Sequence, residues 1–491
     1  MKYGFDNAKY LKIQSEHIKE RIATFGDKLY MEFGGKLFDD YHASRVLPGF
    51  EPDSKLQMLM QLKDELEMII VISALDIEKN KMRADLGITY DMDVLRLRDE
   101  FMARGFSVNS VVITHFNGQA SAEAYRKRLE NMDIRVYYHY TIDGYPNNVS
   151  LIDSDEGFGR NDFVETTRPL VVVTAPGPGS GKMAVCLSQL YQENKRGVKA
   201  GYAKFETFPV WSLSLTHPVN VAYEAATADL DDVNMIDPFH MDAYGVTAVN
   251  YNRDIEIFPV MNALFEDIYG EAPYKSPTDM GVNMIGSCIC DDEVCREASR
   301  QEIIRRYFTG LCNLADGKCT ENEVNKLSLL MKRAKLTVND RRCVVAARER
   351  LEKAQKATSA MELEDGTILT GETSPLLGPS AALLLNAIKH LAGIAHNVKL
   401  IPQTMIEPIQ KLKVDYLHGH NPRLHTDEVL VAISMMGRLD ENCRLALEQL
   451  PNLKGAQVHS TVMLSEVDRK TWNKLGIGLT CDPVRKIKKL G

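Results

Sequence analysis

Residues 170–191 read LVVVTAPGPGSGKMAVCLSQLY, and this stretch decides the fold class of the chain. Residues 170–174 are apolar and mostly β-branched, as in a buried strand, and residues 182–194 have the apolar spacing of a helix. A glycine-rich turn, residues 175–181, joins the two. A buried strand that leads directly into a helix is the repeating unit of a parallel sheet with helices on both faces.

The same alternation of strand and helix runs through most of the chain. Further strands are expected at residues 28–33, 68–73, 110–114, 134–139 and 200–205. Helices are expected between them, at residues 6–25, 54–66, 91–104 and 120–131. We therefore predict an α/β domain over residues 1–287, built on a mostly parallel sheet that contains the glycine-rich strand–loop–helix.

The pattern changes near Cys288. Residues 288–357 are charged, almost free of proline and helical in period, which predicts a helical segment. Strand and helix patterns return after it, so residues 358–491 are expected to form a smaller C-terminal α/β domain. A chain of 491 residues is long enough for this division into several parts.

Charge and composition exclude several classes of partner. The net charge is −8, which gives no electrostatic reason to expect a nucleic-acid or membrane partner. Residues 1–21 lack the apolar core of a signal peptide, no stretch reaches the length of a membrane span, and nine cysteines suit free thiols. We expect a cytoplasmic protein.

The glycine-rich turn has the features that a phosphate-binding loop needs. A strand leads into it, glycines allow backbone N–H groups to point inward, and a helix begins directly after it. The candidate ligand-binding residues are Gly177, Gly179, Ser180, Gly181 and Lys182. The lysine would reach the phosphate groups. The alternative is a tight turn that binds nothing.

Two positions depart from the P-loop pattern G-x-x-x-x-G-K-[ST]. Pro176 stands where the pattern has its first glycine, and Met183 stands where it has the hydroxyl that binds magnesium. The segment PGSGK nevertheless resembles the loops of adenylate-kinase-type proteins. Phosphate binding is therefore predicted more strongly than hydrolysis of a nucleotide with the usual magnesium ligands.

A second candidate phosphate contact is Lys36, which follows Gly34 and Gly35 after the expected strand 28–33. Four polar side chains come soon afterwards: Asp39, Asp40, His42 and Arg45. Such groups line a cleft when they follow the carboxyl end of a strand in an α/β fold. They would equally suit the solvated face of a helix, and this segment alone does not decide between the two.

Residues 216–245 form the densest polar stretch of the chain. Its acids, which include Asp229, Asp231 and Asp232, are candidates to hold a magnesium ion. The candidate catalytic residues are His217, Asp237, His240, Asp242 and Arg253. A histidine would act as a general base, and the arginine would bind a phosphate or carboxylate. The alternative is an acidic surface loop.

Other clusters carry weaker signals. Cys288, Cys290 and Cys295 lack a fourth metal ligand at suitable spacing and are read as ordinary thiols. The three histidines of residues 418–425 suit a solvated loop better than a zinc site. The polar start of the apolar run 378–394 could touch a ligand. We predict no metal-ligand set from these residues.

Six segments together resemble one bacterial family of unknown function. They are FGGKLFDDYHASRVLPGF (33–50), TAPGPGSGKMAVCLSQLY (174–191), HPVNVAYEAATADL (217–230), NRDIEIFPV (252–260), SPTDMGVNM (276–284) and LLGPSAALLLNAIKHLAGI (376–394). The resemblance implies a cytoplasmic, homo-oligomeric, multi-domain α/β protein with a P-loop-like segment. It also implies a C-terminal domain similar in topology to cytidine-deaminase-like folds, although the deaminase zinc signature is absent.

The resemblance supplies no activity. Some family members have been labelled ATP-dependent peptidases, but the chain has neither a G-x-S-x-G nor an H-E-x-x-H motif. The residues favour an enzyme that binds ATP, another nucleotide with Mg²⁺, or another phosphorylated small molecule, and that transfers a phosphoryl group or ligates. The alternative is a non-catalytic regulatory or assembly protein that responds to a nucleotide or metabolite.

Overall fold

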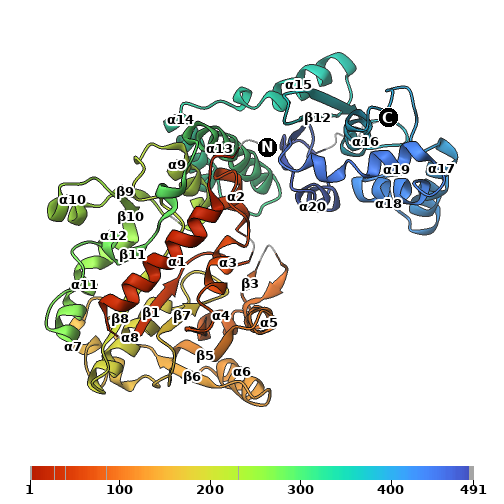
Figure 1. Ribbon diagram of the computed structural model, residues 1–491. Helices are drawn as coiled ribbons and strands as arrows, with labels where there is room; N and C mark the ends of the chain where they lie inside the picture. The colour runs from red at the N-terminus through yellow and green to blue at the C-terminus, as the bar shows by residue number, and fades with distance from the viewer. Residues whose placement is uncertain (1–2, 27, 39, 84–85, 231, 486–491) are drawn as a thin grey trace. The chain divides into compact units, whose positions relative to one another are not determined.

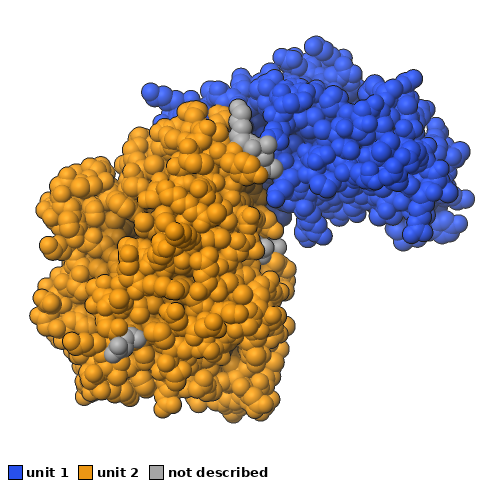
Figure 2. Space-filling model, viewed as in Figure 1, with its two compact units in different colours: residues 1, 300–491 blue, residues 2–299 orange. Residues whose placement is uncertain are grey.

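A computed structural model describes residues 3–485 except 27, 39, 84–85 and 231. The chain forms two compact units, residues 2–299 and residues 300–491 (Figure 2). Each has its own sheet and its own apolar core, which confirms the expected α/β class. The three-part division at residues 288 and 358 stays a prediction.

The first unit is built on seven strands in the order β11-β8-β1-β7-β2-β5-β6, and every adjacent pair is parallel (Figure 1). The strands are β1 (Lys28–Phe33), β2 (Leu66–Ser73), β5 (Ser107–Phe116), β6 (Val136–Tyr140), β7 (Leu170–Thr174), β8 (Ala200–Phe205) and β11 (Gly281–Val282). Two short antiparallel pairs stand apart from this sheet: β3 (Met82–Arg83) with β4 (Ile88–Thr89), and β9 (Asn234–Ile236) with β10 (Val249–Tyr251).

Twelve α-helices of this unit lie in the described part of residues 2–290. They are α1 (Asn7–Thr24), α2 (Tyr41–Val46), α3 (Ser54–Met60), α4 (Ala74–Glu78), α5 (Tyr90–Ala103), α6 (Ala120–Glu130), α7 (Val149–Ile152), α8 (Lys182–Lys195), α9 (Pro218–Ala226), α10 (Pro238–Tyr244), α11 (Asn252–Tyr269) and α12 (Pro277–Met280). A longer helix, α13 (Asp292–Ala315), contains the boundary between the two units.

Strand β7 is the central strand of the sheet, between β1 and β2. All five of its residues are buried. Val172 packs in the core that contains α1, α3, α5 and α6, whereas Val171 and Val173 pack in the core that contains α8 and α11. A strand that is covered on both faces needs apolar residues at every position, which explains the run LVVV.

The direction in which successive strands are added to the sheet reverses at β7. From β1 the chain passes outward through β2, β5 and β6 with α3, α5 and α6 on one face; after β7 it enters α8 on the other face (Figure 1). Right-handed crossovers force this change of face when the direction of winding reverses. The carboxyl ends of β1 and β7, which are neighbours, therefore border a crevice of the kind in which α/β proteins bind ligands.

The second unit has a smaller sheet in the order β13-β12-β14-β15. Its strands are β12 (Thr358–Glu362), β13 (Ile368–Glu372), β14 (Gln457–Ser460) and β15 (Gly478–Cys481). Only β14 and β15 pair in parallel; β12 is antiparallel to β13 and β14. The helices are α14 (Glu321–Arg333), α15 (Arg342–Ala354), α16 (Pro379–Leu391), α17 (Gln403–Lys411), α18 (Thr426–Met436), α19 (Glu441–Leu447) and α20 (Glu466–Lys474). Within the parts of the chain that are described, no helix combines the length and apolarity that crossing a membrane requires.

The burial of the central strands predicts a large cost for truncating them. Ile70 in β2 is fully buried, so Ile70→Ala should lower the free energy of unfolding of the first unit by about 2–5 kcal/mol. Met102 in α5 is 49% exposed, so Met102→Ala should change it by less than about 0.5 kcal/mol. Guanidinium titrations followed by circular dichroism measure both, and equal effects would contradict this account of the core.

Candidate functional site

The loop between β7 and α8 depends on its glycines for two different reasons. Gly179 and Gly181 have φ angles of +72° and +86°, a region that L side chains rarely adopt. Gly177 has no such angle, but a Cβ there would lie 2.2 Å from the Tyr90 hydroxyl oxygen. The loop is therefore packed against α5. Gly179 and Gly181 are favoured by their φ angles, and any side chain at Gly177 would displace Tyr90.

The N-terminus of α8 is suited to bind an anion. Gly181 is the N-cap residue and supplies no side-chain cap. The first helical hydrogen bond runs from the Val185 amide to the Gly181 carbonyl, so the amides of residues 182–184 have no acceptor within the helix. These N–H groups and the helix dipole give this end a partial positive charge.

The side chains of Thr114 and Ser180 give further information on the loop: one fixes its position, and the other is buried within it. The Thr114 hydroxyl, at the end of β5, donates a 2.6 Å hydrogen bond to the Ser180 carbonyl and holds the loop against the sheet. Ser180 itself is only 2% exposed, and its Oγ has no hydrogen-bond partner among the described residues. A buried hydroxyl without a partner is unusual and suits a position that a ligand completes.

Lys182 is the first residue of α8, and its charge faces a carboxylate. Its Nζ lies 4.0 Å from Oε1 of Glu32, and both side chains are largely buried. Glu32 is near the carboxyl end of β1, in register with Val173 of β7, and it accepts a 2.9 Å hydrogen bond from Tyr202. The lysine of the glycine-rich loop and an acid on the adjacent strand thus lie together.

Three more charged groups adjoin this pair. Lys204 of β8 is in register with Glu32. Its Nζ lies 2.5 and 2.6 Å from the two carboxylate oxygens of Asp254, in the first turn of α11, and 2.9 Å from Oε1 of Glu206. We call Glu32, Lys182, Lys204, Glu206 and Asp254 the buried charge cluster. Three carboxylates in it face two ammonium groups.

Burial favours the protonated form of Glu206. Burial raises the pKa of Glu206 from 4.5 to about 8, and the nearby charge of Lys204 offsets only part of this rise. Burial also lowers the pKa of Lys204, but the charges of Asp254 and Glu206 outweigh this and leave it above its ordinary value. Lys204 therefore stays charged, and Glu206 gains or loses a proton near neutral pH.

A small cavity borders the cluster. Its volume is ≈ 30 Å³, and Lys204, Glu206, Asp254, Trp211 and Asn250 are among the residues that line it. A polar cavity needs about 10–15 Å³ by this measure to hold a water molecule. Glu206 therefore has room beside it for a water that could accept or deliver its proton.

The predicted catalytic residues lie outside this cluster. His217 accepts from the Val219 amide at the start of α9 and lies 2.9 Å from Asp292. Asp237 caps α10 and also accepts from Thr278. These contacts tie both side chains to other segments, and their catalytic role stays a prediction.

The remaining candidates of this stretch have other partners. His240 lies 2.9 Å from the Ser276 hydroxyl, Arg253 pairs with Asp232, and Asp242 is exposed in α10. Asp229 is exposed too, while Asp231 lies outside the described residues. No group of three or more His, Cys, Asp or Glu side chains in the described portion of the chain is arranged to hold a metal ion.

The candidate residues after β1 also lie outside the buried charge cluster. Lys36 is exposed, Asp40 caps α2 and pairs with Lys55 at 2.6 Å, and Asp39 lies outside the described residues. The nine cysteines form no disulfide. Burial raises the pKa of Cys288 to about 11 and that of Cys295 to about 12, which makes both thiols poor nucleophiles.

Sequence reasoning assigned no role to four members of the charge cluster, which are Glu32, Lys204, Glu206 and Asp254. Glu32 and Lys204 each interrupt an apolar strand just before its carboxyl end, in KLYMEF and AGYAKF. A charge at such a position needs a partner, because the strand is buried on both faces. That pattern was a usable signal for both residues. Glu206, directly after β8, could be recognised as a proton carrier only from its surroundings.

Comparisons with known proteins cover nearly the whole chain. Residues 3–335 match the family described as "Domain of unknown function DUF1846, N-terminal", and residues 339–490 match its C-terminal counterpart. A UPF0371 protein of Corynebacterium urealyticum is 55% identical over 481 residues, 98% of this chain and 97% of its own. A UPF0371 protein of Streptococcus pyogenes serotype M5 is 54% identical over 487 residues, 99% of each chain.

The raised pKa of Glu206 predicts a pH-dependent stability. Between pH 4.5 and about 8 the folded chain holds a proton on Glu206 that the unfolded chain releases, so this group's stabilising contribution falls as pH rises through that window. The loss approaches about 1.4 kcal/mol per pH unit at most. Glu206→Gln cannot ionise and should flatten this dependence. Urea titrations from pH 5 to pH 9 measure it; Glu271→Gln, on the surface, is the control, and parallel curves for all three proteins would contradict the assignment.

Proposed function

We propose that this chain, which belongs to the DUF1846 family, binds a nucleotide or another phosphorylated small molecule at residues 177–182 and transfers a phosphoryl group or ligates. The observation that carries the proposal is the uncapped N-terminus of α8 beside Lys182 and the buried charge cluster. The family description gives no activity, and these residues supply the support.

A phosphate group would satisfy several unmet interactions at once. It would accept hydrogen bonds from the amides at the start of α8 and from the Ser180 hydroxyl, and it would attract the Lys182 ammonium group. Lys182 would then exchange its 4.0 Å contact with Glu32 for a contact with the ligand. Lys182 and Glu32 thus balance each other's charge, and the site would adapt to an anion by moving one side chain.

A magnesium ion fits this site only together with a nucleotide. Glu32 has the position of an acid on the strand adjacent to the loop strand, as in P-loop proteins, but Met183 supplies no hydroxyl ligand. Mg²⁺ commonly takes one or two carboxylates and completes its shell with water and substrate phosphates. Glu32 would be the protein ligand, and the ion would neutralise phosphate charge.

Glu206 is the group best suited to move a proton. Its pKa of about 8 lies near neutral pH, where a group is effective both as an acid and as a base. Lys204 holds it in place at 2.9 Å, while burial and the negative charge of Asp254 keep it from being a permanent carboxylate. We assign it the role of proton donor or acceptor for the substrate that receives the phosphoryl group.

A second candidate function is supported by Met183. Binding without hydrolysis does not need the missing hydroxyl, so the chain could be a regulatory or assembly protein that responds to a nucleotide or metabolite, as a homo-oligomer. Saturable binding without any product, together with a ligand-dependent change of oligomer size, would select this function over catalysis.

The phosphate site predicts a specific effect of Lys182. A ligand at about 100 times its dissociation constant stabilises a protein by about 2.7 kcal/mol, which a thermal unfolding experiment detects. ATP, ADP, inorganic phosphate and sugar phosphates, each with and without Mg²⁺, are the probes. Lys182→Ala should weaken binding at least about tenfold. Lys195→Ala, at the far end of the same helix, should leave it unchanged. Equal binding by Lys182→Ala would exclude the loop as the site.

Substituting Glu32 distinguishes its two proposed roles, as the partner of Lys182 and as a ligand of Mg²⁺. Without Mg²⁺, Glu32→Gln removes the carboxylate that competes for Lys182, so inorganic phosphate should bind about 3–10 times more tightly. With Mg²⁺, the same variant should bind ATP more weakly, because the ion loses its protein ligand. Calorimetric titrations give both constants. If Glu32→Gln changes neither of them, Glu32 is not part of the site.

A further inference from the structure

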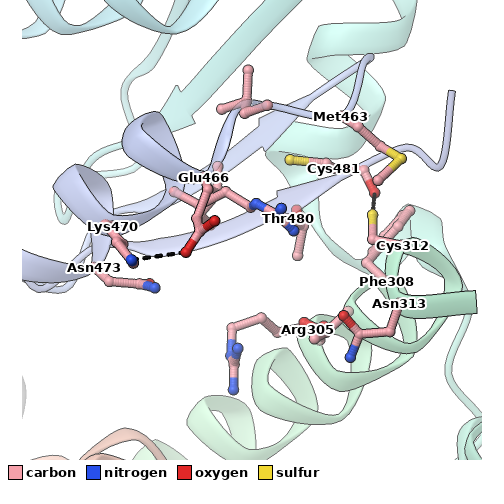
Figure 3. A pocket seen from close by; sticks show the side chains of 14 residues that line it. Arg305, Phe308, Cys312, Asn313, Met463, Glu466, Lys470, Asn473, Thr480 and Cys481 are labelled. Atoms are coloured by element: carbon pink, nitrogen blue, oxygen red, sulfur yellow. Dashed lines mark hydrogen bonds and ion pairs between the residues drawn. The ribbon is translucent and has the colours of Figure 1, made fainter. Parts of the chain in front are cut away.

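A further cavity lies in the second unit, a part of the chain that does not contain the glycine-rich loop. Its volume is ≈ 270 Å³, and it is lined by residues of α13, α20 and the edge strand β15. Figure 3 shows Arg305 extending from α13 and Lys470 with Asn473 from α20. The volume is close to the lower end of the range for small-molecule sites.

The charges that line the cavity are mostly positive. Arg305, Arg469 and Lys470 contribute three cations, and Glu466 is the single carboxylate among the lining residues. Glu466 is paired with Lys470 at 2.7 Å (Figure 3) and is also influenced by the charge of Arg469, so one carboxylate stands against three cations in the lining. The lining is thus positively charged, whereas the chain as a whole carries a net charge of −8.

The two arginines keep donors for a further acceptor. Arg305 donates from Nε and Nη2 to the buried Glu302, which Arg306 shares. A guanidinium group has five N–H donors, so these two bonds do not exhaust it. Arg469 has a looser contact, 3.7 Å from Asp316.

Asp316 is a weak competitor for Arg469. It also lies 3.7 Å from Lys318 and 3.3 Å from Arg485, so one carboxylate faces three cations. The surplus positive charge extends beyond the lining residues and would attract an anion toward the cavity.

The rest of the lining is apolar or neutral. Phe308 is almost fully buried, and Met463, Leu464 and Leu479 contribute further apolar surface. Asn313 and Asn473 add amide groups that can both donate and accept hydrogen bonds. Apolar walls with a few convergent polar groups are typical of sites for small organic molecules.

We infer that the second unit binds a small organic anion in this cavity. Arg305 and Arg469 hold its phosphate or carboxylate group, and its compact apolar body contacts Phe308, Met463 and Leu479. The inference does not depend on phosphate binding at residues 177–182.

The test uses the full chain and two probes that share one apolar body. Phenyl phosphate and phenylacetate distinguish a phosphate from a carboxylate head group, and inorganic phosphate tests the head group alone. We expect one of the two organic anions to bind saturably with a dissociation constant below about 1 mM, and at least about tenfold more tightly than inorganic phosphate. Calorimetry measures these constants.

Matched variants locate the binding. The double substitution Arg469→Gln with Lys470→Gln should raise the dissociation constant at least about tenfold. Lys474→Gln, an exposed residue at the end of α20, and Lys182→Ala should leave it unchanged. Circular dichroism establishes that each variant is folded. No saturable binding of either organic anion, or binding that Lys182→Ala removes and the double variant retains, would overturn the inference.

Discussion

The burial of β7 on both faces is the constraint on which the first unit depends. The strand lies between β1 and β2 and packs valines against helices on either side. The chain leaves the carboxyl end of β7 through the glycine-rich turn of residues 175–181. In this turn Gly177 lies close to Tyr90, and Gly179 and Gly181 have positive φ angles that suit glycine. The free end of α8 follows from the same turn.

Burying the charge cluster lowers the stability of the fold, which suggests that the cluster is kept for a function. Moving charged groups out of water requires several kcal/mol each, and ion pairs recover this only with good geometry. Lys204 and Asp254 have such geometry, with two short contacts. Glu206 has a single, longer contact with Lys204, and its raised pKa favours the protonated form. Groups with shifted pKa values concentrate at functional sites, because catalysis needs them there.

The sequence predicted the framework of this site better than its chemistry. The run LVVVT and the glycine pattern of residues 175–181 identify a buried strand, a loop and a helix, because local spacing decides all three. The charge cluster unites residues of β1, α8, β8 and α11, and only the strand order brings Glu32 next to Lys182 and Lys204. Dense polar stretches such as residues 216–245 suggested a site, but Asp237 caps a helix, a role that sequence alone does not distinguish from catalysis.

The central claim is that the start of α8 binds a phosphate group, and a crystal structure of the chain with bound ADP tests it most directly. The account predicts a phosphate oxygen about 2.7–3.2 Å from amide nitrogens of residues 182–184, with the Lys182 ammonium group moved from Glu32 to the phosphate. ADP bound elsewhere, with Lys182 still beside Glu32, would contradict it.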